Sequence, residues 1–451
     1  MTEVPRIRVV VINFDGGDMT IDCLQSLLGT DWPSEKLEIV LVDNGSLDDV
    51  VEQVARRFPE VRILEPLANL GFAGGCNLGI TAPVVAGSEP AFVALVNNDA
   101  TVQRSWLREL HRAIEAAPDI GASSAKMLFA DRVNGLEFEV HPHEAKPETA
   151  DFMRITGLRV DGIRDDDRVV FDEGVFGPTG FMSNEGAEMS RWTKGRGSIR
   201  VRVVEGSAAR SLELRLSSSH PSRVRFHGDG VENSFDLSSD PTWVRVDLPA
   251  TTFDVINNVG SNLFAGGFGG DRGFLERDRG QYDSPAEVFA WCGGAVLLRC
   301  GYLDSVGVFD ERLFLYYEDT DLSWRGRLQG WRYVYEPAAV VRHRHAQSSG
   351  VGSPVFRFHT ERNRLLVLAK CAPVGLAVRA GLGELRRMII CNVRDLLLRP
   401  LALRIPVRIE AAHRRRVFFS YVSLLPGMIR DRVMMDRRVS RRSLIRWQVS
   451  K

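Results

Sequence analysis

The sequence predicts an α/β fold built on a parallel sheet with helices on both faces. Strand-like and helix-like segments alternate strictly from the first strand to about residue 117, which is typical of such a sheet. Each of the longer apolar segments in this part ends abruptly in Asn, Asp or Gly. In open α/β folds ligands bind outside the carboxyl ends of the strands, so these polar ends predict where a site would lie.

Four apolar segments are expected to form the first strands. Ile7–Ile12 ends in Asn13, and Leu37–Val42 ends in Asp43-Asn44-Gly45-Ser46. A short strand at Val61–Leu64 precedes the glycine-rich segment Asn69–Asn77, which predicts a loop. Helical periodicity fills the other intervals, around Ile21–Leu28, Asp48–Phe58 and Ser105–Ala117.

The fourth strand, Ala91–Val96, ends in Asn97-Asn98-Asp99. An oxygen-rich cluster at the edge of a sheet suits a hard cation such as Mg²⁺ or Mn²⁺, which would in turn hold a diphosphate. Asn and Asp also end strands simply by forming turns. His343 and His345 follow a later strand-like segment, and either could complete a metal site with Asp99.

Near residue 140 the pattern changes to short strands in which polar and apolar residues alternate. Period-two alternation with one solvated face predicts an antiparallel sandwich, and it recurs over 199–203, 212–216, 223–226 and 243–246. We therefore divide the chain into a first α/β part over 1–139, an inserted β-sandwich over 140–252, a second α/β part over 253–360 and a basic helical region over 361–451.

The formal net charge is zero, but the C-terminal region is strongly basic. From Arg357 onward there are 22 Lys and Arg against 6 Asp and Glu, and Arg interrupts the apolar segments at close intervals. Basic amphipathic helices lie in a membrane interface rather than crossing it, so we expect an anionic membrane surface as a partner. The alternative is a helical cap that packs on the α/β domain with Arg on its solvated face. No nucleic-acid partner is expected.

The N-terminus and the cysteines point to the cytoplasm. Met1–Pro5 runs into the first strand without the charged and apolar regions of a signal peptide. The six cysteines show neither CxxC pairs nor zinc-site spacing, which favours reduced thiols. We expect a cytoplasmic protein that is peripheral on the inner face of the plasma membrane.

A second acidic cluster, Glu318-Asp319-Thr320-Asp321, lies between aromatic residues. Three carboxylates within four positions repel one another, which raises at least one pKa and produces a base that can accept a proton. The structural alternative is a helix N-terminus, where Asp and Glu complement the helix dipole. Both interpretations can hold together.

Taken together, these motifs resemble the inverting nucleotide-sugar glycosyltransferases of family 2, which have a GT-A fold. The likeness is greatest to rhamnosyltransferase-like members that build bacterial cell-wall and O-antigen glycans. It covers roughly 1–139 and 253–365, and it rests on motifs in the family's order: Asn13, Asp43-Asn44-Gly45-Ser46, Asn69–Asn77, Asn97-Asn98-Asp99, Asp278–Asp283, Trp291-Cys292-Gly293-Gly294, Glu318-Asp319, His343 and Glu361-Arg362-Asn363-Arg364.

The resemblance implies a role for each matching residue. Asp319 would be the general base, with Glu318 beside it and Asp321 in support. Asp99 would be the carboxylate of a DxD-type motif in which Asn97 replaces the first Asp, and His343 would help it to hold Mg²⁺ or Mn²⁺. Asp43 would contact the nucleobase, and the other expected donor-binding residues are Asn13, Asn69, Gly71, Asn77 and Asn98. The acceptor would meet Trp291, Gly293 and Gly294.

The function so implied is inverting transfer of rhamnose or a hexose. The donor would be a nucleotide-diphosphate sugar, either dTDP-rhamnose or a UDP-sugar, and the acceptor a cell-wall, O-antigen or other polysaccharide or lipid-linked glycan. A dehydrogenase is disfavoured because Gly71–Gly75 fails the G-x-G-x-x-G spacing. A nucleotidyltransferase is disfavoured because the segment after the first strand, Asp15–Asp18, is acidic. The alternative function is a non-catalytic glycan-binding protein, in which sugars would stack on Trp192, Trp243 and Phe226 of the insert; the other interpretation of these aromatic residues is that they form the core of the sandwich.

Overall fold

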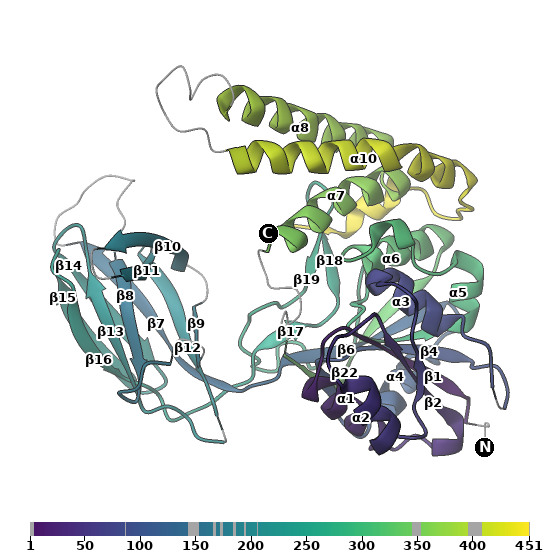
Figure 1. Ribbon diagram of the computed structural model, residues 1–451, viewed down its shortest axis with the longest axis horizontal. Helices are drawn as coiled ribbons and strands as arrows, with labels where there is room; N and C mark the ends of the chain where they lie inside the picture. The colour runs from purple at the N-terminus through teal and green to yellow at the C-terminus, as the bar shows by residue number, and fades with distance from the viewer. Residues whose placement is uncertain are drawn as a thin grey trace. The chain divides into compact units, whose positions relative to one another are not determined.

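The computed structural model describes residues 4–85, 87–142, 153–165, 168–171, 175–183, 186–193, 195–204, 206–344, 353–395 and 408–450. The chain forms two compact units (Figure 1). The α/β unit contains Met1–Leu128, Ile256–Phe274 and Arg279–Lys451, and the β unit contains Phe129–Val255 and Leu275–Asp278.

The α/β unit is built on a sheet whose first half is parallel. Strand β1 pairs in parallel with β2 and β4, and β2 pairs with β3, so that Asn13 lies beside Asp43 at the strand ends. The bounds of these strands are β1 (Ile7–Asn13), β2 (Leu37–Asp43), β3 (Arg62–Leu64) and β4 (Phe92–Asn97). Both faces of the sheet are covered by core, because Val9 and Val11 face one apolar cluster while Val10 faces the other.

The second half of the sheet is not parallel. Strand β21 (Ala295–Arg299) runs antiparallel to both β4 and β6, so the expected parallel arrangement holds only for β1 to β4. The remaining strands are β5 (Ala100–Val102), β6 (Ile120–Phe129), β17 (Ile256–Asn258), β20 (Ala286–Glu287) and β22 (Arg332–His343). A small separate sheet contains β18 (Ser261–Phe264), β19 (Phe268–Asp271) and β23 (Gln448–Val449).

The glycine-rich segment predicted as a loop is instead the helix α3 (Gly71–Ile80). Its glycines let the helix lie very close to β1. A Cβ at Gly79 would come within 2.3 Å of Val10, and one at Gly75 within 3.3 Å of Ile12. The other helices of this part are α1 (Asp18–Leu28), α2 (Val50–Arg57), α4 (Trp106–Ile114), α5 (Cys300–Val306) and α6 (Glu318–Gln329), with short 3-10 turns at η1 (Ser34–Lys36) and η3 (Glu311–Leu313).

The β unit is a sandwich of two five-stranded antiparallel sheets. One contains β15 (Val231–Leu237), β14 (Ser222–Gly228), β7 (Val133–Pro142), β12 (Arg196–Arg202) and β9 (Val169–Phe171), and the other contains β10 (Val175–Ser183), β11 (Gly186–Thr193), β8 (Met153–Val160), β13 (Ser211–Ser217) and β16 (Thr242–Asp247). Alternate residues such as Leu136, Phe138 and Val140 of β7 face the shared core. We expected the insert to begin at residue 140, whereas β7 already belongs to this unit from Val133.

The basic C-terminal region forms helices α7 (Pro354–Cys371), α8 (Val374–Val393) and α10 (Arg408–Met434), followed by the 3-10 turn η5 (Ser443–Trp447). Helix α7 is buried along much of its length, and α8 and α10 lie side by side over it (Figure 1). Within the described part of the chain, no helix is both long and apolar enough to cross a membrane.

Candidate active site

A network of polar side chains joins the carboxyl ends of β1, β2 and β4. The amide of Asn13 donates to Asp43 Oδ1 (2.7 Å) and to Ser46 Oγ (2.8 Å). Its oxygen accepts from Thr20 Oγ1 (2.6 Å) and from the amide of Asn98 (3.0 Å). Asn13 is fully buried, so it frames the edge of the sheet rather than presenting free groups to a ligand.

Asp43 shapes the turn that follows β2. Its Oδ1 accepts from Asn13 and from Ser46 Oγ, and its Oδ2 accepts from the N–H groups of Gly45 (3.3 Å) and Ser46 (3.0 Å). Four bonds use the acceptor capacity of a carboxylate. A nucleobase contact through Asp43 would have to share these bonds.

The expected donor-binding residues around α3 have different surroundings. Asn69 Oδ1 accepts from the N–H of Gly71 (2.8 Å), which closes the turn that precedes the helix. The amide of Asn77 instead bonds Glu311 Oε1 and both backbone groups of Phe309. Asn77 therefore ties α3 to the segment before α6, a role that no local pattern around Asn77 predicts.

The structure brings together the two predicted metal ligands. Asp99 Oδ1 lies 2.9 Å from His343 Nε2, and both residues are buried. The amide of Asn97 lies 3.1 Å from the same ring nitrogen, and Asn257 Oδ1 lies 3.0 Å from Nδ1. An Nδ1–H that donates to Asn257 leaves Nε2 as the nitrogen with a lone pair, which is the form that binds a cation. His345 lies outside the described residues.

This donor set fits a small divalent cation. Adjacent ligands of an octahedral shell with bonds of about 2.1 Å are about 3 Å apart, which is close to the separation of the Asp99 and His343 atoms. The described residues contain no group of three or more His, Cys, Asp and Glu that could hold a metal. A cation here would therefore take its other ligands from a diphosphate and from water, as Mg²⁺ commonly does.

Glu318 and Asp319 open helix α6. Asp319 Oδ2 accepts from the N–H of Gly293 (3.3 Å), and Oδ1 accepts from the N–H (2.6 Å) and the hydroxyl (3.2 Å) of Thr320. Burial raises the pKa of Asp319. Burial, followed by the charge of Asp319, raises the pKa of Glu318 well above its usual range, and Glu318 Oε2 is buried without a hydrogen-bond partner. The predicted repulsion is present, but burial is the larger cause.

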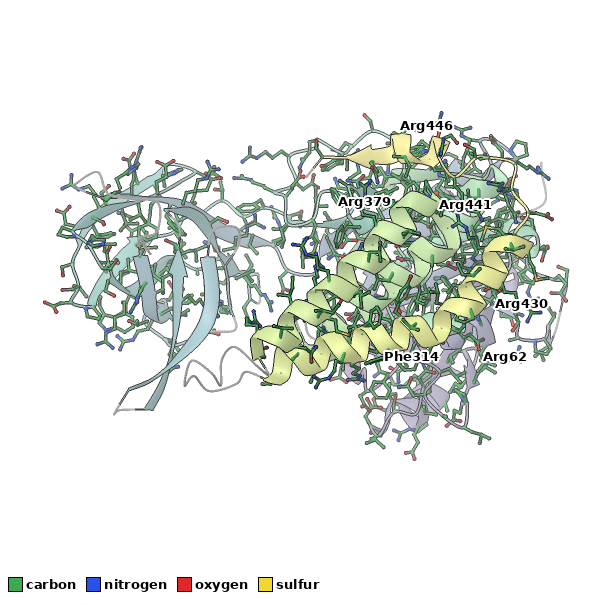
Figure 2. The ribbon with its side chains drawn as sticks, turned by 90° about the horizontal axis from the view of Figure 1, so that it is seen from above. Arg62, Phe314, Arg379, Arg430, Arg441 and Arg446 are labelled. Carbon is green, nitrogen blue, oxygen red and sulfur yellow. The ribbon has the colours of Figure 1, made fainter. Side chains whose placement is uncertain are left out.

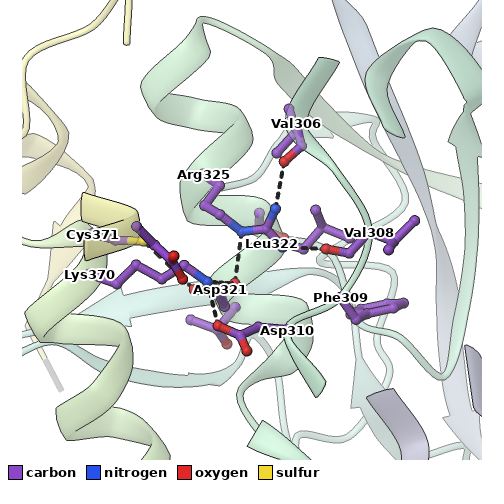
Figure 3. A network of polar contacts seen from close by, with 12 residues as sticks. Val306, Val308, Phe309, Asp310, Asp321, Leu322, Arg325, Lys370 and Cys371 are labelled. Carbon is purple, nitrogen blue, oxygen red and sulfur yellow. Dashed lines mark hydrogen bonds and ion pairs between the residues drawn. The ribbon is translucent and has the colours of Figure 1, made fainter. Parts of the chain in front are cut away.

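The third carboxylate of the cluster, Asp321, lies in a buried ionic network with Arg325 and Lys370 (Figure 3). It accepts from Arg325 Nε (2.8 Å) and from Lys370 Nζ (3.0 Å), and Lys370 also bonds Asp310 Oδ2 (2.7 Å). Arg325 donates in addition to the carbonyls of Val306 and Val308. Asp321 therefore fixes α6 to α7.

The turn Trp291–Gly294 lies between the two acidic clusters. The N–H of Gly293 reaches Asp319, and the carbonyl of Gly294 accepts from the N–H of Asn97 (3.0 Å). The ring of Trp291 is 0% exposed and packs against Phe309, so it cannot contact an acceptor in this structure. The expected acceptor role of that side chain is thereby corrected: Trp291 anchors the turn in the core.

Asp271, at the end of β19, was missed in the sequence. Its Oδ1 accepts from the amide of Asn258 (2.5 Å). Desolvation by the surrounding protein raises the pKa of Asp271 to about 6, although the residue remains accessible to solvent, and the charge of Asp319 adds to the rise while His343 opposes it. Asp271 is thus within electrostatic reach of both clusters. The only sequence signal was a carboxylate after two glycines.

The aromatic residues considered for glycan binding do not form a platform among the described residues. Phe226 is fully buried in the core of the β unit. Trp243 is 43% exposed, and the guanidinium of Arg159 lies over its ring at 4.5 Å. The side chain of Trp192 lies outside the described residues.

Residues 8–143 match the model of the family described as glycosyl transferase family 2. This segment is a family 2 glycosyltransferase domain. The α/β fold and the inserted β sheets predicted from the sequence are confirmed.

Two relatives are similar in sequence to short segments of this chain. The N-acetylglucosaminyl-diphospho-decaprenol L-rhamnosyltransferase of Mycobacterium tuberculosis is 48% identical over 61 residues, which cover 13% of this chain and 20% of the relative. The uncharacterized glycosyltransferase YibD of Escherichia coli is 30% identical over 135 residues, which cover 29% and 37%. The chain therefore spans only a fifth to somewhat over a third of these relatives.

Two solved structures are similar at low identity. GalNAc-T7 with UDP, GalNAc and Mn²⁺ has a TM-score of 0.45 at 11% identity, over 95% of this chain and 58% of the other. A mannosyltransferase from Pyrobaculum calidifontis in complex with GDP-Man and Mn²⁺ has a TM-score of 0.40 at 12% identity, over 94% and 88%.

Proposed function

We propose that this protein is an inverting glycosyltransferase that uses a nucleotide-diphosphate sugar. One observation carries the proposal: the Gly293-Gly294 turn touches both acidic clusters, so that a carboxylate with a raised pKa and the Asp99–His343 pair share one edge of the sheet. A base and a cation site at opposite ends of a short turn are what transfer from a diphosphate requires.

Asp319 would act as the general base. The acceptor hydroxyl attacks the anomeric carbon from the face opposite the diphosphate, its proton passes to Asp319, and the carbon–oxygen bond to the diphosphate breaks. A single displacement inverts the anomeric centre. The N–H groups of Gly293 and Thr320 fix the orientation of the carboxylate, and the raised pKa of Asp319 lets it accept the proton readily.

Asp99 and His343 would hold Mg²⁺ or Mn²⁺. When bound, the cation supplies positive charge opposite the leaving diphosphate. The Asn13 network behind these residues keeps the strand ends in register, because every polar atom of its central amide is bonded within the protein.

The donor sugar is proposed to be rhamnose or a hexose, and the acceptor a polysaccharide or lipid-linked glycan. The support is the rhamnosyltransferase from M. tuberculosis, whose name specifies a lipid-linked sugar acceptor. Because only a short segment is shared, dTDP-rhamnose and UDP-sugars are both candidate donors.

Isothermal titration with dTDP, UDP and GDP, each with and without Mn²⁺, tests the donor site. We expect one diphosphate to bind in a metal-dependent manner, and Asp99→Ala to abolish the effect of the metal. Asp319→Asn should leave this binding intact and lower turnover by at least about 100-fold. If no diphosphate binds to the folded wild-type protein, the transferase proposal fails.

Helices α8 and α10 support attachment to an anionic membrane at the cytoplasmic face. Only Glu384 of α8 is fully buried, whereas Val378 and Leu382 are exposed one turn apart on one stripe of the helix. Figure 2 looks down on this layer and shows Arg379 on α8 and Arg430 on α10. An apolar stripe with Arg at its margin suits the interface of an anionic bilayer.

Sedimentation with vesicles tests this attachment. We expect the protein to pellet with phosphatidylserine vesicles, and the double variant Val378→Asp/Leu382→Asp to remain in the supernatant with unchanged donor binding. A matched control places the same two charges on exposed apolar residues of the β unit, Ile163 and Val204, which changes the net charge equally. If the α8 variant still pellets, α8 does not attach the protein to the membrane.

A further inference from the structure

The segment that leads into the proposed base has an unusual backbone. Phe314, Tyr316 and Tyr317 have φ angles of +65°, +67° and +71°. None is a glycine, and left-handed backbone is unfavourable for an ordinary residue because its Cβ comes too close to the following carbonyl oxygen. Such a conformation persists only where the surrounding structure holds it. Glu318 and Asp319 follow directly, so whatever holds this segment also sets the position of the carboxylates.

Two neighbouring residues of α7 hold the segment from one side. The amide of Asn363 donates to the carbonyls of Leu313 (2.9 Å), Leu315 (2.9 Å) and Tyr316 (2.6 Å). Arg362 donates to the carbonyls of Arg312 (3.1 Å) and Leu313 (2.9 Å). Both side chains are buried, and together they bond four backbone carbonyls of this irregular segment, those of residues 312, 313, 315 and 316.

Arg362 also orients Asn363. Its Nε donates to Asn363 Oδ1 at 2.8 Å, which directs the NH₂ group of the amide toward the three carbonyls. A side-chain amide can rotate to exchange its oxygen and nitrogen, and this bond selects one orientation. The two residues therefore act as a unit.

Helix α3 meets the same segment from the other side. The carbonyl of Phe314 accepts from the N–H of Ala73 (3.2 Å), and a Cβ at Gly71 would lie only 2.4 Å from that carbonyl oxygen. The segment is therefore confined between the glycine-rich helix and α7.

We propose, on the basis of the function proposed above, that Asn363, oriented by Arg362, is a positioning residue that presents Asp319 to the acceptor hydroxyl. Asn363 acts through the backbone of 313–317 and touches no reacting atom. The basic C-terminal region is then part of the catalytic frame as well as a membrane-binding surface. Loss of the amide lets the left-handed residues relax and moves Asp319 out of line, which lowers turnover and leaves donor binding intact.

Asn363→Ala removes the amide, and Arg362→Lys is a milder variant that keeps the charge but loses the forked geometry. Asn392→Ala is the matched control, because the Asn392 amide also donates to a backbone carbonyl, that of Met388 (2.8 Å), but on α8. The measurements are kcat, KM for donor and acceptor, donor Kd by titration, Tm, and amide hydrogen exchange over 312–319.

We expect Asn363→Ala to lower kcat at least tenfold with donor Kd unchanged within twofold, Arg362→Lys to give a smaller loss, and Asn392→Ala to give none. Exchange over 312–319 should accelerate in Asn363→Ala, less so in Arg362→Lys, and not in Asn392→Ala. An equal loss of kcat in Asn392→Ala, or unchanged kcat and exchange in Asn363→Ala and Arg362→Lys, overturns the proposal. Hydrogen exchange needs no substrate, so the two proposals can fail separately. A wild-type protein without transferase activity refutes the proposed function. Unchanged exchange in Asn363→Ala refutes the positioning role of Asn363.

Discussion

Asp319 and Asp321 lie two positions apart on one helix, and their replacement by asparagine should have opposite consequences. Asp321 is 0% exposed and is the carboxylate that Arg325 and Lys370 share. Asparagine keeps the shape of the side chain but removes the negative charge that neutralises the buried Arg325 and Lys370. Breaking a buried ion pair from one side costs about 3–5 kcal/mol. In a protein of this size each kcal/mol lowers Tm by roughly 2 °C, so Asp321→Asn should lower Tm by about 6–10 °C.

Asp319→Asn is the matched control. Burial raises the pKa of Asp319, which means that the folded protein disfavours its charge. Removal of that charge should leave Tm within about 2 °C of the wild type, or raise it, while turnover falls.

Calorimetry and single-turnover assays on the same preparations separate the two residues. Asp321→Asn should retain turnover per folded molecule at a temperature well below its transition. If instead Asp321→Asn is as stable as the wild type, the ionic network is not a structural device. If Asp319→Asn loses stability as Asp321→Asn does, the distinction between base and anchor is wrong.

Three further predictions concern neighbouring residues. Burial raises the pKa of Glu318, so the contribution of this residue to the stability of the folded protein is full below the ordinary pKa of 4.5 and is lost as pH rises through the raised pKa. Glu318→Gln should therefore be increasingly more stable than the wild type as pH rises above 4.5, as measured by urea denaturation. A difference in stability that does not change with pH would contradict this. Gly71 has a φ of +68°, and a Cβ there would lie 2.4 Å from the carbonyl oxygen of Phe314, whereas Gly45 has a φ of +88° and open space around it. Gly71→Ala should therefore lower the free energy of unfolding by more than Gly45→Ala, which should lower it by about 1 kcal/mol. Equal losses would show that the close approach of Gly71 to Phe314 is unimportant. His343→Ala, like removal of metal by EDTA, should weaken diphosphate binding in Mn²⁺ titrations, and unaltered binding would exclude His343 as a ligand.

The parts that the sequence predicted are those that depend on local pattern. An apolar strand that ends in Asn13 or Asp43 must place a polar group at the edge of the sheet, and the pairing of β1 with β2 does so. The Asp99–His343 contact was predicted across 243 intervening positions only because both residues follow strands and the family resemblance joined them.

The parts that were missed depend on contacts between distant segments. Glycines in α3 suggested a loop, because helix propensity gave no indication that close packing on Val10 would require them. Burial of Trp291 follows from the rings around it and not from its own motif. The hydrogen bonds of Asn363 reach carbonyls about 50 residues away, and no spacing rule on one segment reveals them.

The main segment of the β unit, Phe129–Val255, leaves and rejoins the α/β sheet at one point. Leu128 of β6 pairs with Ile256 of β17, so the ends of the insertion are antiparallel neighbours within the sheet. An ordinary hairpin turn could join the same two residues. Closing a flexible loop as long as this insertion would cost roughly 4 kcal/mol, but a domain that folds with its own ends together removes that cost from the sheet. The junction is therefore a position where whole domains can be gained, lost or exchanged during evolution, and where a reporter domain could be grafted, without a change in the strand order of the α/β sheet.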